Sequence, residues 1–372
     1  MLFSTFAWSF TFISLPFHVR ELSDLDAAAT LRWTGWIVGI TNLVTVVTAP
    51  VWGRLGRRYD PKTLYIAVEA LQGASFLALA AARSLGELFV IRFVLGGWGA
   101  ASTFAFIIAG RSPDPADVRR RVAHVQSALT VGQVFGPLVG AVTAVQLGFR
   151  GSFLVGGAIL FGCAWLVHRG ATVPPPTTAT TARTAHTNWR DVAHVTAIVL
   201  GGSIQVMFLP AILPEILPTL GVSADRTIQV AGMLIFVSGV AAALGALLAT
   251  RLPDVFPDAR LIPALLALSS GFLVAFGFAG SVWMLGALRF FQVLCVAPVF
   301  PMVIARIAHR AGGEAIGFIN SGRIAAAFIG PVAATMLLAW APAPVLYAAL
   351  GVVGFACVPL AWRGELARWT PA

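Results

Sequence analysis

The sequence predicts an all-α membrane protein with twelve transmembrane helices in two pseudo-symmetric halves of six. Of its 372 residues, 58% are hydrophobic and only 11% are charged, whereas charged residues make up about a quarter of ordinary soluble domains. The apolar residues gather in segments of about the length that spans a bilayer as a helix. The sequence also contains an internal repeat. A shift of 197 residues aligns Arg54-Leu55 with Arg251-Leu252 and Arg92-Phe93 with Arg289-Phe290.

Each half contains six apolar segments separated by shorter polar loops. The first segment follows Met1 directly and lacks the basic start and small-residue cleavage site of a signal peptide, so we expect it to be retained as a helix. Boundaries taken from hydropathy are good to a few residues. The predicted spans are 2–19, 33–53, 63–82, 86–109, 122–145, 151–168, 193–216, 227–249, 261–280, 282–305, 315–340 and 343–362.

The longest polar interruption, residues 170–190, is rich in Pro and Thr and has no apolar periodicity. Such a composition is typical of a flexible linker, because it offers nothing to bury. We therefore predict an N-terminal six-helix bundle over residues 1–169 and a C-terminal six-helix bundle over residues 191–372.

The basic residues predict the orientation of the spans. Seventeen Lys and Arg residues fall on one side of the predicted membrane and five on the other. Cytoplasmic loops carry the excess of positive charge. We therefore expect a multi-pass protein of the plasma (inner) membrane with both termini and the linker in the cytoplasm.

Composition and motifs argue against several other classes of protein. The formal net charge is +10, but the arginines lie between apolar runs and form no basic helix face, so we expect no nucleic-acid partner. Cys163, Cys295 and Cys357 each stand alone in an apolar segment, without the spacing of a metal site or a disulfide framework. The HExxH and GxSxG motifs of hydrolases are absent. We therefore expect no enzymatic activity, no metal and no cofactor.

Three motifs together resemble the major facilitator superfamily over nearly the whole chain. The basic loop GRLGRRYDPK follows the second span, LFVIRFVLGGWGAAS lies in the fourth, and GQVFGPLVGA lies in the fifth. In the family, a GxxxDRxGRR/K loop follows the second helix, an arginine-glycine motif lies in the fourth, and exporters carry GxxxGPxxGG in the fifth. The resemblance implies the major facilitator fold and a transport function.

The basic loop departs from the family pattern. Gly53 holds its first position and Arg58 its sixth, but Arg57 replaces the acidic fifth residue and Asp60 the second glycine. In the family that acid is implicated in latching the cytoplasmic gate. The resemblance therefore implies a gating loop in which Asp60 is the candidate substitute. Its residues are Gly53, Arg57, Arg58 and Asp60.

The fifth span carries glycines at every fourth position, which lets two helices approach closely. Pro137 removes one backbone hydrogen bond and bends the helix. Static packing would explain the pattern, and the resemblance to exporters implies instead a conformational elbow. Ala141 departs from the final glycine of the exporter motif. The elbow residues are Gly132, Gly136, Pro137 and Gly140.

Polar and ionisable residues inside spans are candidates for contacts with a solute or a proton, because they are costly in lipid and usually functional. Arg323 lies about 12 Å into its span, close to the midplane. Glu69 is the one acid well inside a span, and its depth predicts no pairing with Arg92, for which a structural role is equally open. The candidates are Trp8, Asn42, Glu69, Arg92, Gln126, Thr130, Gln133, Gln205, Asn320 and Arg323.

The resemblance implies a secondary transporter that alternates access around a site between its halves, exporting a solute in exchange for protons. The aromatic first span suits an amphipathic organic solute, and the intramembrane arginines suit an anionic group. The alternatives are an uptake carrier for a small organic anion, and a non-transporting receptor or scaffold. We expect a monomer in the lipid bilayer, with a small-molecule solute and protons as its partners.

Overall fold

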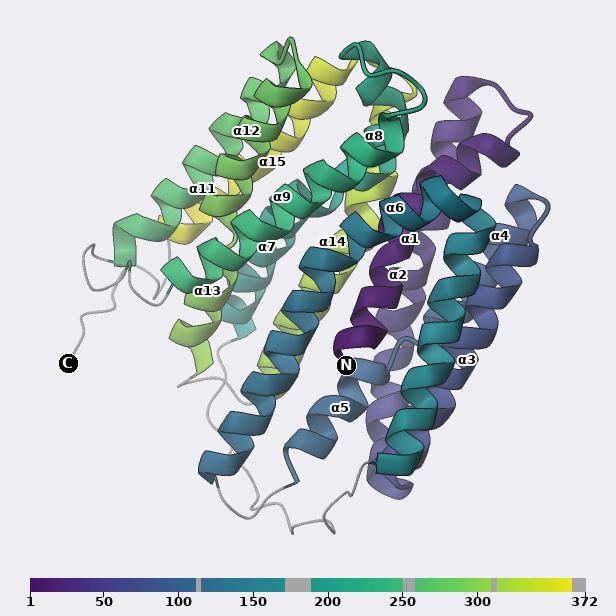
Figure 1. Ribbon diagram of the computed structural model, residues 1–372. Helices are drawn as coiled ribbons and strands as arrows, with labels where there is room; N and C mark the ends of the chain where they lie inside the picture. Colours follow the sequence, from purple (N-terminus) through teal and green to yellow (C-terminus); the bar gives the residue numbers. More distant parts are fainter. Residues whose placement is uncertain (112–114, 171–188, 250–251, 253–257, 309–312, 363–372) are drawn as a thin grey trace. The chain divides into compact units, whose positions relative to one another are not determined.

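The computed structural model describes residues 1–111, 115–170, 189–249, 252, 258–308 and 313–362 (Figure 1). These residues form α-helices, one short 3₁₀ turn and loops, and no strand occurs among them. Eleven helical stretches of this described part are long and apolar enough to cross a membrane. Each of the twelve predicted spans corresponds to one or two helical segments, and the fifth and sixth share the longest helix.

The helices of the N-terminal half follow the predicted spans closely. They are α1 (Leu2–Leu22), α2 (Ala27–Arg58), α3 (Pro61–Ala81), α4 (Leu85–Gly97), α5 (Ala101–Ala109) and α6 (Pro115–Gly170). Helix α6 joins the fifth and sixth predicted spans across Gly148, whose φ of 71° lies in the left-handed region that glycine tolerates. The predicted break between these two spans is therefore a kink at one glycine.

The C-terminal half repeats this order with more interruptions. Its helices are α7 (Trp189–Met207), α8 (Leu209–Thr219), α9 (Thr227–Leu248), α11 (Asp258–Ala275), α12 (Val282–Val296), α13 (Val299–Ala308), α14 (Gly313–Leu338) and α15 (Ala343–Trp362), with a 3₁₀ turn at Phe276–Phe278 after α11.

Three predicted spans are each divided into two helices, which is a correction to their prediction as single helices. Pro210 follows the α7–α8 junction and Pro298 lies in the α12–α13 junction, and proline supplies no N–H to the helical ladder. Between α4 and α5 the chain makes a turn after Gly97, where the N–H of Trp98 donates to the Leu95 carbonyl at 3.1 Å.

Side-chain caps fix several helix starts, and the two halves use them at equivalent places. Ser84 caps α4 by accepting from the N–H of Glu87, and Ser281 caps α12 by accepting from the N–H of Met284. A capping hydroxyl satisfies one of the four backbone donors left free at a helix start. The internal repeat therefore extends to the local chemistry of the helix ends.

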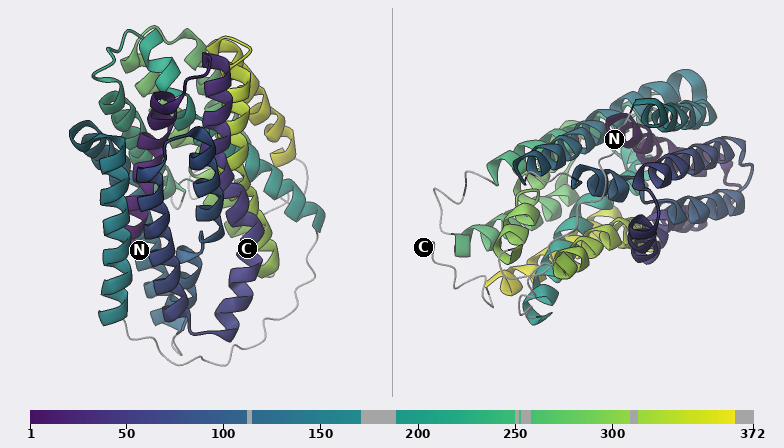
Figure 2. Two further views of the ribbon diagram at one scale, coloured as in Figure 1. Left: turned by 90° about the vertical axis from the view of Figure 1, so that its right-hand side faces the viewer. Right: turned by 90° about the horizontal axis from the view of Figure 1, so that it is seen from below.

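The contacts divide the chain into two compact units. The first comprises Met1–Thr180 and Asp225–Phe236, and the second comprises Thr181–Ala224 and Val237–Ala372. In the first unit, α1 and α3 pack chiefly against α6, and α2 packs against α4. In the second, α7 packs against α14 and α11 against α15. Figure 2 shows the helices running alongside one another within each unit.

Candidate functional site

The basic loop after α2 is built around Asp60. Its Oδ2 accepts hydrogen bonds from the backbone N–H of Thr63 at 3.0 Å and from the Thr63 hydroxyl at 2.9 Å, which caps α3. Partial burial opposes ionisation, but these bonds, the Lys62 N–H and the charge of Arg111 together hold the pKa of Asp60 below its usual value. Asp60 therefore remains a carboxylate near the end of α5.

The neighbouring residues of this predicted gating loop lie at the end of α2. Gly53 has open space around it, and Arg58 is the last residue of the helix and is exposed. The side chain of Arg57 lies outside the described residues. A Cβ on Gly56 would lie 3.2 Å from the Phe104 ring, so this glycine lets α2 approach α5 closely. The roles assigned to the loop residues stay a prediction.

The glycines of the predicted elbow face α1. A Cβ on Gly132 would lie 2.7 Å from the Leu2 carbonyl oxygen, and one on Gly136 would lie 2.8 Å from that of Phe6. One on Gly140 would lie 3.0 Å from the Phe10 Cα atom. The motif therefore seats α6 directly on the backbone of α1, with Pro137 buried in the same stretch.

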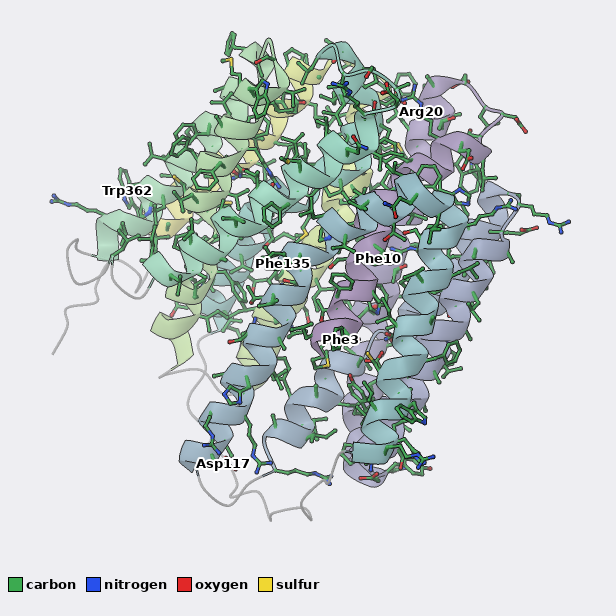
Figure 3. The ribbon with its side chains drawn as sticks, viewed as in Figure 1. Phe3, Phe10, Arg20, Asp117, Phe135 and Trp362 are labelled. Atoms are coloured by element: carbon green, nitrogen blue, oxygen red, sulfur yellow. The ribbon has the colours of Figure 1, made fainter. Side chains whose placement is uncertain are left out.

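The aromatic residues of α1 serve packing more than the sequence suggests. Figure 3 shows Phe3 and Phe10 on this helix, and Phe3 is exposed whereas Phe10 is enclosed and stacks edge-on with Phe6. The Trp8 indole packs edge-on against Phe76 of α3. The aromatic character of α1 therefore supports the solute prediction less directly than expected.

A polar seam joins α1 and α3. The Trp8 indole N–H donates to Gln72 Oε1 at 2.7 Å, and Gln72 Nε2 donates to the Trp98 carbonyl at 2.6 Å. One turn away lie Ser4 and Glu69, both fully enclosed. The predicted solute candidate Trp8 is thus held by a neighbouring helix.

The guanidinium group of Arg92 donates hydrogen bonds to backbone carbonyls of α2. Its Nε donates to the Ile37 carbonyl at 3.1 Å and its Nη2 to the Val38 carbonyl at 3.0 Å. Its Nη1 is buried without a hydrogen-bond partner. Among the described residues no ion pair joins Arg92 to Glu69, as the depths of the two residues predict.

The polar stripe on α6 lies at the surface of the first unit. Gln126 and Gln133 are exposed, and Thr130 is half-buried, with its hydroxyl donating to the Gln126 carbonyl at 3.0 Å. Asn42 of α2 is also half-buried. Amide groups directed at lipid would lack partners, so the exposed stripe suits an aqueous environment.

The second unit encloses a polar network around Arg289. Its Nε donates to Ser238 Oγ at 3.0 Å, its Nη1 to Gln292 Oε1 at 2.7 Å and to the Gln205 carbonyl at 3.0 Å, and its Nη2 to the Val206 carbonyl at 2.7 Å. Residue 210 is proline, so the Val206 carbonyl has no helical N–H to accept. Arg289 supplies the missing donor.

Gln205 completes the network, and its predicted contact with a solute stays a prediction. Its Oε1 accepts from Ser269 Oγ at 2.9 Å and its Nε2 donates to Ser270 Oγ at 3.3 Å. Gln292 Nε2 also donates to Ser269, at 3.0 Å. In this conformation both polar atoms of the Gln205 amide therefore have a protein partner. The sequence did not point to Ser269, Ser270 or Gln292, although Gln292 stands one helical turn after a buried arginine.

Arg323 of α14 presents an incomplete set of contacts. Its Nε donates to Asn320 Oδ1 at 3.2 Å, and its guanidinium carbon lies 5.5 Å from the centroid of the Phe300 ring. Among the described residues, its two terminal nitrogens have no hydrogen-bond partner. Arg323 and Asn320 were predicted from the sequence as candidates, and Phe300 was not. Arg323, Asn320 and Phe300 therefore bring a guanidinium group, an amide and an aromatic ring together.

Comparisons with known proteins agree with this architecture. The family model described as Major Facilitator Superfamily matches residues 1–224 and 195–371. The chain is 25% identical over 336 residues to YuxJ, an MFS-type transporter of Bacillus subtilis (strain 168), covering 87% of this chain and 84% of that protein. It is 25% identical over 349 residues to multidrug resistance protein MdtG of Yersinia enterocolitica, covering 89% and 82%.

A solved structure of similar fold is a bacterial homologue of the human lysosomal transporter Spinster, in an inward-facing and occupied conformation. The TM-score is 0.81 at 14% identity, over 100% of this chain and 96% of that one. This likeness and the family match confirm the predicted fold class.

Proposed function

Because the chain belongs to the Major Facilitator Superfamily, we propose that it exports a small amphipathic organic solute in exchange for protons. Membership of this family shows that the protein is a multi-pass membrane transporter and not an enzyme. Alternating access requires the halves of such a protein to rearrange around a central site. We further propose that the protein is a monomer in the plasma (inner) membrane, with both of its termini on the cytoplasmic side.

Two observations support efflux as the direction of transport. MdtG relatives named as multidrug resistance proteins are 24–25% identical over 85% or more of this chain. The fifth-span motif also places glycine against the backbone of α1 at Gly132 and Gly136. A contact this close must be remade each time the helices move, so we assign the motif to the elbow of the transport cycle.

The solute class rests on Arg323. A guanidinium group that keeps two nitrogens free inside a helical bundle lacks the partners that buried charges ordinarily have. A carboxylate or similar anion would accept from both nitrogens in a bidentate pair. The Phe300 ring beside it offers an apolar surface to the rest of the solute. We therefore assign an anionic amphipathic solute to this arrangement.

The exposed stripe of Gln126, Thr130 and Gln133 is assigned to the path of the solute. Amide side chains can donate and accept, so they suit solutes of varied chemistry. The assignment follows from their exposure on the first unit and from the cost of leaving amides unpaired in lipid.

The test is efflux of carboxyfluorescein, an anionic dye, and ethidium, a cationic dye, from cells that produce each Arg323 variant. We expect Arg323→Ala to raise the apparent KM for carboxyfluorescein about tenfold or more, because a hydrogen bond to a charged group contributes about 1.5–3 kcal/mol. Arg323→Lys should recover only part, since lysine keeps the charge and loses the bidentate geometry. Arg226→Ala, at an exposed arginine, is the matched control.

Unchanged carboxyfluorescein efflux in a folded Arg323→Ala variant would overturn the anionic-solute assignment. An uptake carrier for a small organic anion would use the same arginine, so the direction of dye movement decides between the two transport functions. Accumulation of the dye inside producing cells, above the level in control cells, would favour the uptake carrier.

A further inference from the structure

Glu69 is a buried acid that the packing of the first unit leaves unpaired. It lies in α3, its residue exposure is 0%, and both carboxyl oxygens lack a hydrogen-bond partner. The hydroxyls of Ser4 and Tyr65 lie nearest, but neither completes a hydrogen bond of standard geometry to it. The Tyr65 hydroxyl is instead directed at Met1 Sδ, at 3.3 Å.

Helices α1, α5 and α6 and the start of the chain contribute the groups that lie around the Glu69 carboxyl. Helix α1 supplies the Ser4 hydroxyl, the chain start supplies the Met1 amino group, and α6 supplies the Cys163 thiol. Helix α5 contributes an apolar cluster that includes Phe104. Among the described residues, the Met1 amino group is the charged group that lies close enough to influence Glu69. A carboxylate in these surroundings would be strongly unfavourable, so the carboxyl is neutral while the site is closed.

The internal repeat shows that the fold does not need an acid here. The repeat that carries Arg92 onto Arg289 carries Glu69 onto Leu266, which is also 0% exposed and lies in the apolar core of the second unit. A leucine therefore satisfies the same structural position. An acid at this position adds the free-energy cost of burying a polar group without a hydrogen bond of standard geometry in return.

Glu69 lies beside a helix that is held on both sides. Ser4 and Trp8 of α1 face α3, and Trp8 bonds to Gln72, one turn from Glu69. The other side of α1 receives the glycines of α6, with Gly136 against Ser9. Separation of α1 from α3 would open the carboxyl to water on the side of Ser4 and Trp8, and it would also shift the α1–α6 contact.

We propose that Glu69 carries the exchanged proton. While α1 lies against α3 the carboxylic acid keeps its proton; when this contact opens to water the O–H bond breaks, the proton passes to water and a carboxylate remains. Reprotonation from the other side of the membrane allows α1 to close again. This inference rests on the proton exchange proposed above.

The experiment uses carboxyfluorescein in proteoliposomes that contain the parent, Glu69→Gln or Glu69→Asp. Two assays are run on each: dye counterflow without a pH gradient, and accumulation driven by an imposed pH gradient. Glu69→Gln should keep counterflow within about twofold of the parent and lose gradient-driven accumulation. Glu69→Asp should keep part of both. A variant with an added N-terminal extension moves the charged amino group away from Glu69. In this background, too, Glu69→Gln should keep counterflow and lose gradient-driven accumulation.

Three outcomes overturn the proposal. Gradient-driven accumulation by Glu69→Gln equal to that of the parent shows that the proton is carried elsewhere. If the parent shows counterflow but does not respond to the pH gradient, the protein does not exchange protons, and Glu69 cannot have this role. Glu69→Leu, which copies Leu266, should be at least as thermally stable as the parent; a large loss of stability would show that the acid is structural.

Discussion

Arg92 in the first unit and Arg289 in the second occupy equivalent places in the internal repeat, but their guanidinium groups are partnered differently. Every nitrogen of Arg289 has an acceptor, including a carbonyl that Pro210 leaves free. Arg92 bonds two carbonyls of α2 and leaves Nη1 buried and unpaired. The same residue is thus fully satisfied in one unit and partly satisfied in the other.

The polar groups near Arg289 are also better satisfied by hydrogen bonds than those near Arg92. Gln205 and Ser269 of the second unit occupy the repeat positions of Trp8 and Gln72, and they close a network in which each amide is used. In the first unit the equivalent seam contains the unpaired Glu69. Satisfied networks rigidify a bundle, whereas unsatisfied groups mark sites under functional constraint. The comparison is consistent with a structural role for the second network and with the proposal that Glu69 in the first seam carries a proton.

The largest expected difference in thermal stability is between variants of Arg289 and Arg92. Arg289→Leu removes four hydrogen bonds and orphans buried acceptors, at about 1–3 kcal/mol each. Arg92→Leu removes two bonds to carbonyls of the continuous helix α2 and also removes an unpaired donor. We expect the Tm of purified protein to fall markedly more for Arg289→Leu. Equal losses would show that the two arginines do the same structural work.

A smaller effect is expected at a glycine beside the network. A Cβ on Gly354 would meet the Gln205 amide nitrogen and the Ser270 hydroxyl oxygen, so Gly354→Ala must displace both. A Cβ on Gly157, its repeat equivalent, would lie 3.1 Å from the Gly73 carbonyl oxygen. We expect a clear fall in Tm for Gly354→Ala and a slight one for Gly157→Ala. Gly271→Ala, with open space around it, is the control.

The smallest effect concerns the cap of α3. Asp60→Ala should destabilise by about 1 kcal/mol, the ordinary value of an N-cap, and Asp60→Asn by less. The folded pKa of Asp60 lies below its usual value, so the added stability is present above the unfolded pKa of about 4 and is lost as the pH falls through the folded value. Tm measured between neutral pH and about pH 3 should therefore fall less steeply in Asp60→Asn.

The fold was predictable from the sequence because bilayer thickness sets the length of a span and the repeat appears in single residues such as Arg92 and Arg289. The junctions after Gly97, at Phe208 and at Ala297 were not, since hydropathy averages over a break that keeps the chain apolar. Composition also hid the merging of two spans at Gly148, because one glycine turns the backbone without a polar loop.

The site was predictable as a set of residues and not as an arrangement. Sequence spacing placed Gln126 and Gln133 on one face, but it did not distinguish an exposed glutamine from Gln205, which is enclosed by serines of another helix. Likewise, the glycine spacing predicted a close helix approach without identifying α1 as the partner. Such facts depend on contacts between helices far apart in sequence.

The proposed exchange of solute for protons is tested most directly by transport into liposomes. Purified protein in liposomes is given carboxyfluorescein outside and a pH gradient that is acidic inside. The account predicts that the dye accumulates inside above its equilibrium level, and that a protonophore abolishes the accumulation. Equal dye entry with and without the gradient, at a rate above that of protein-free liposomes, would contradict it.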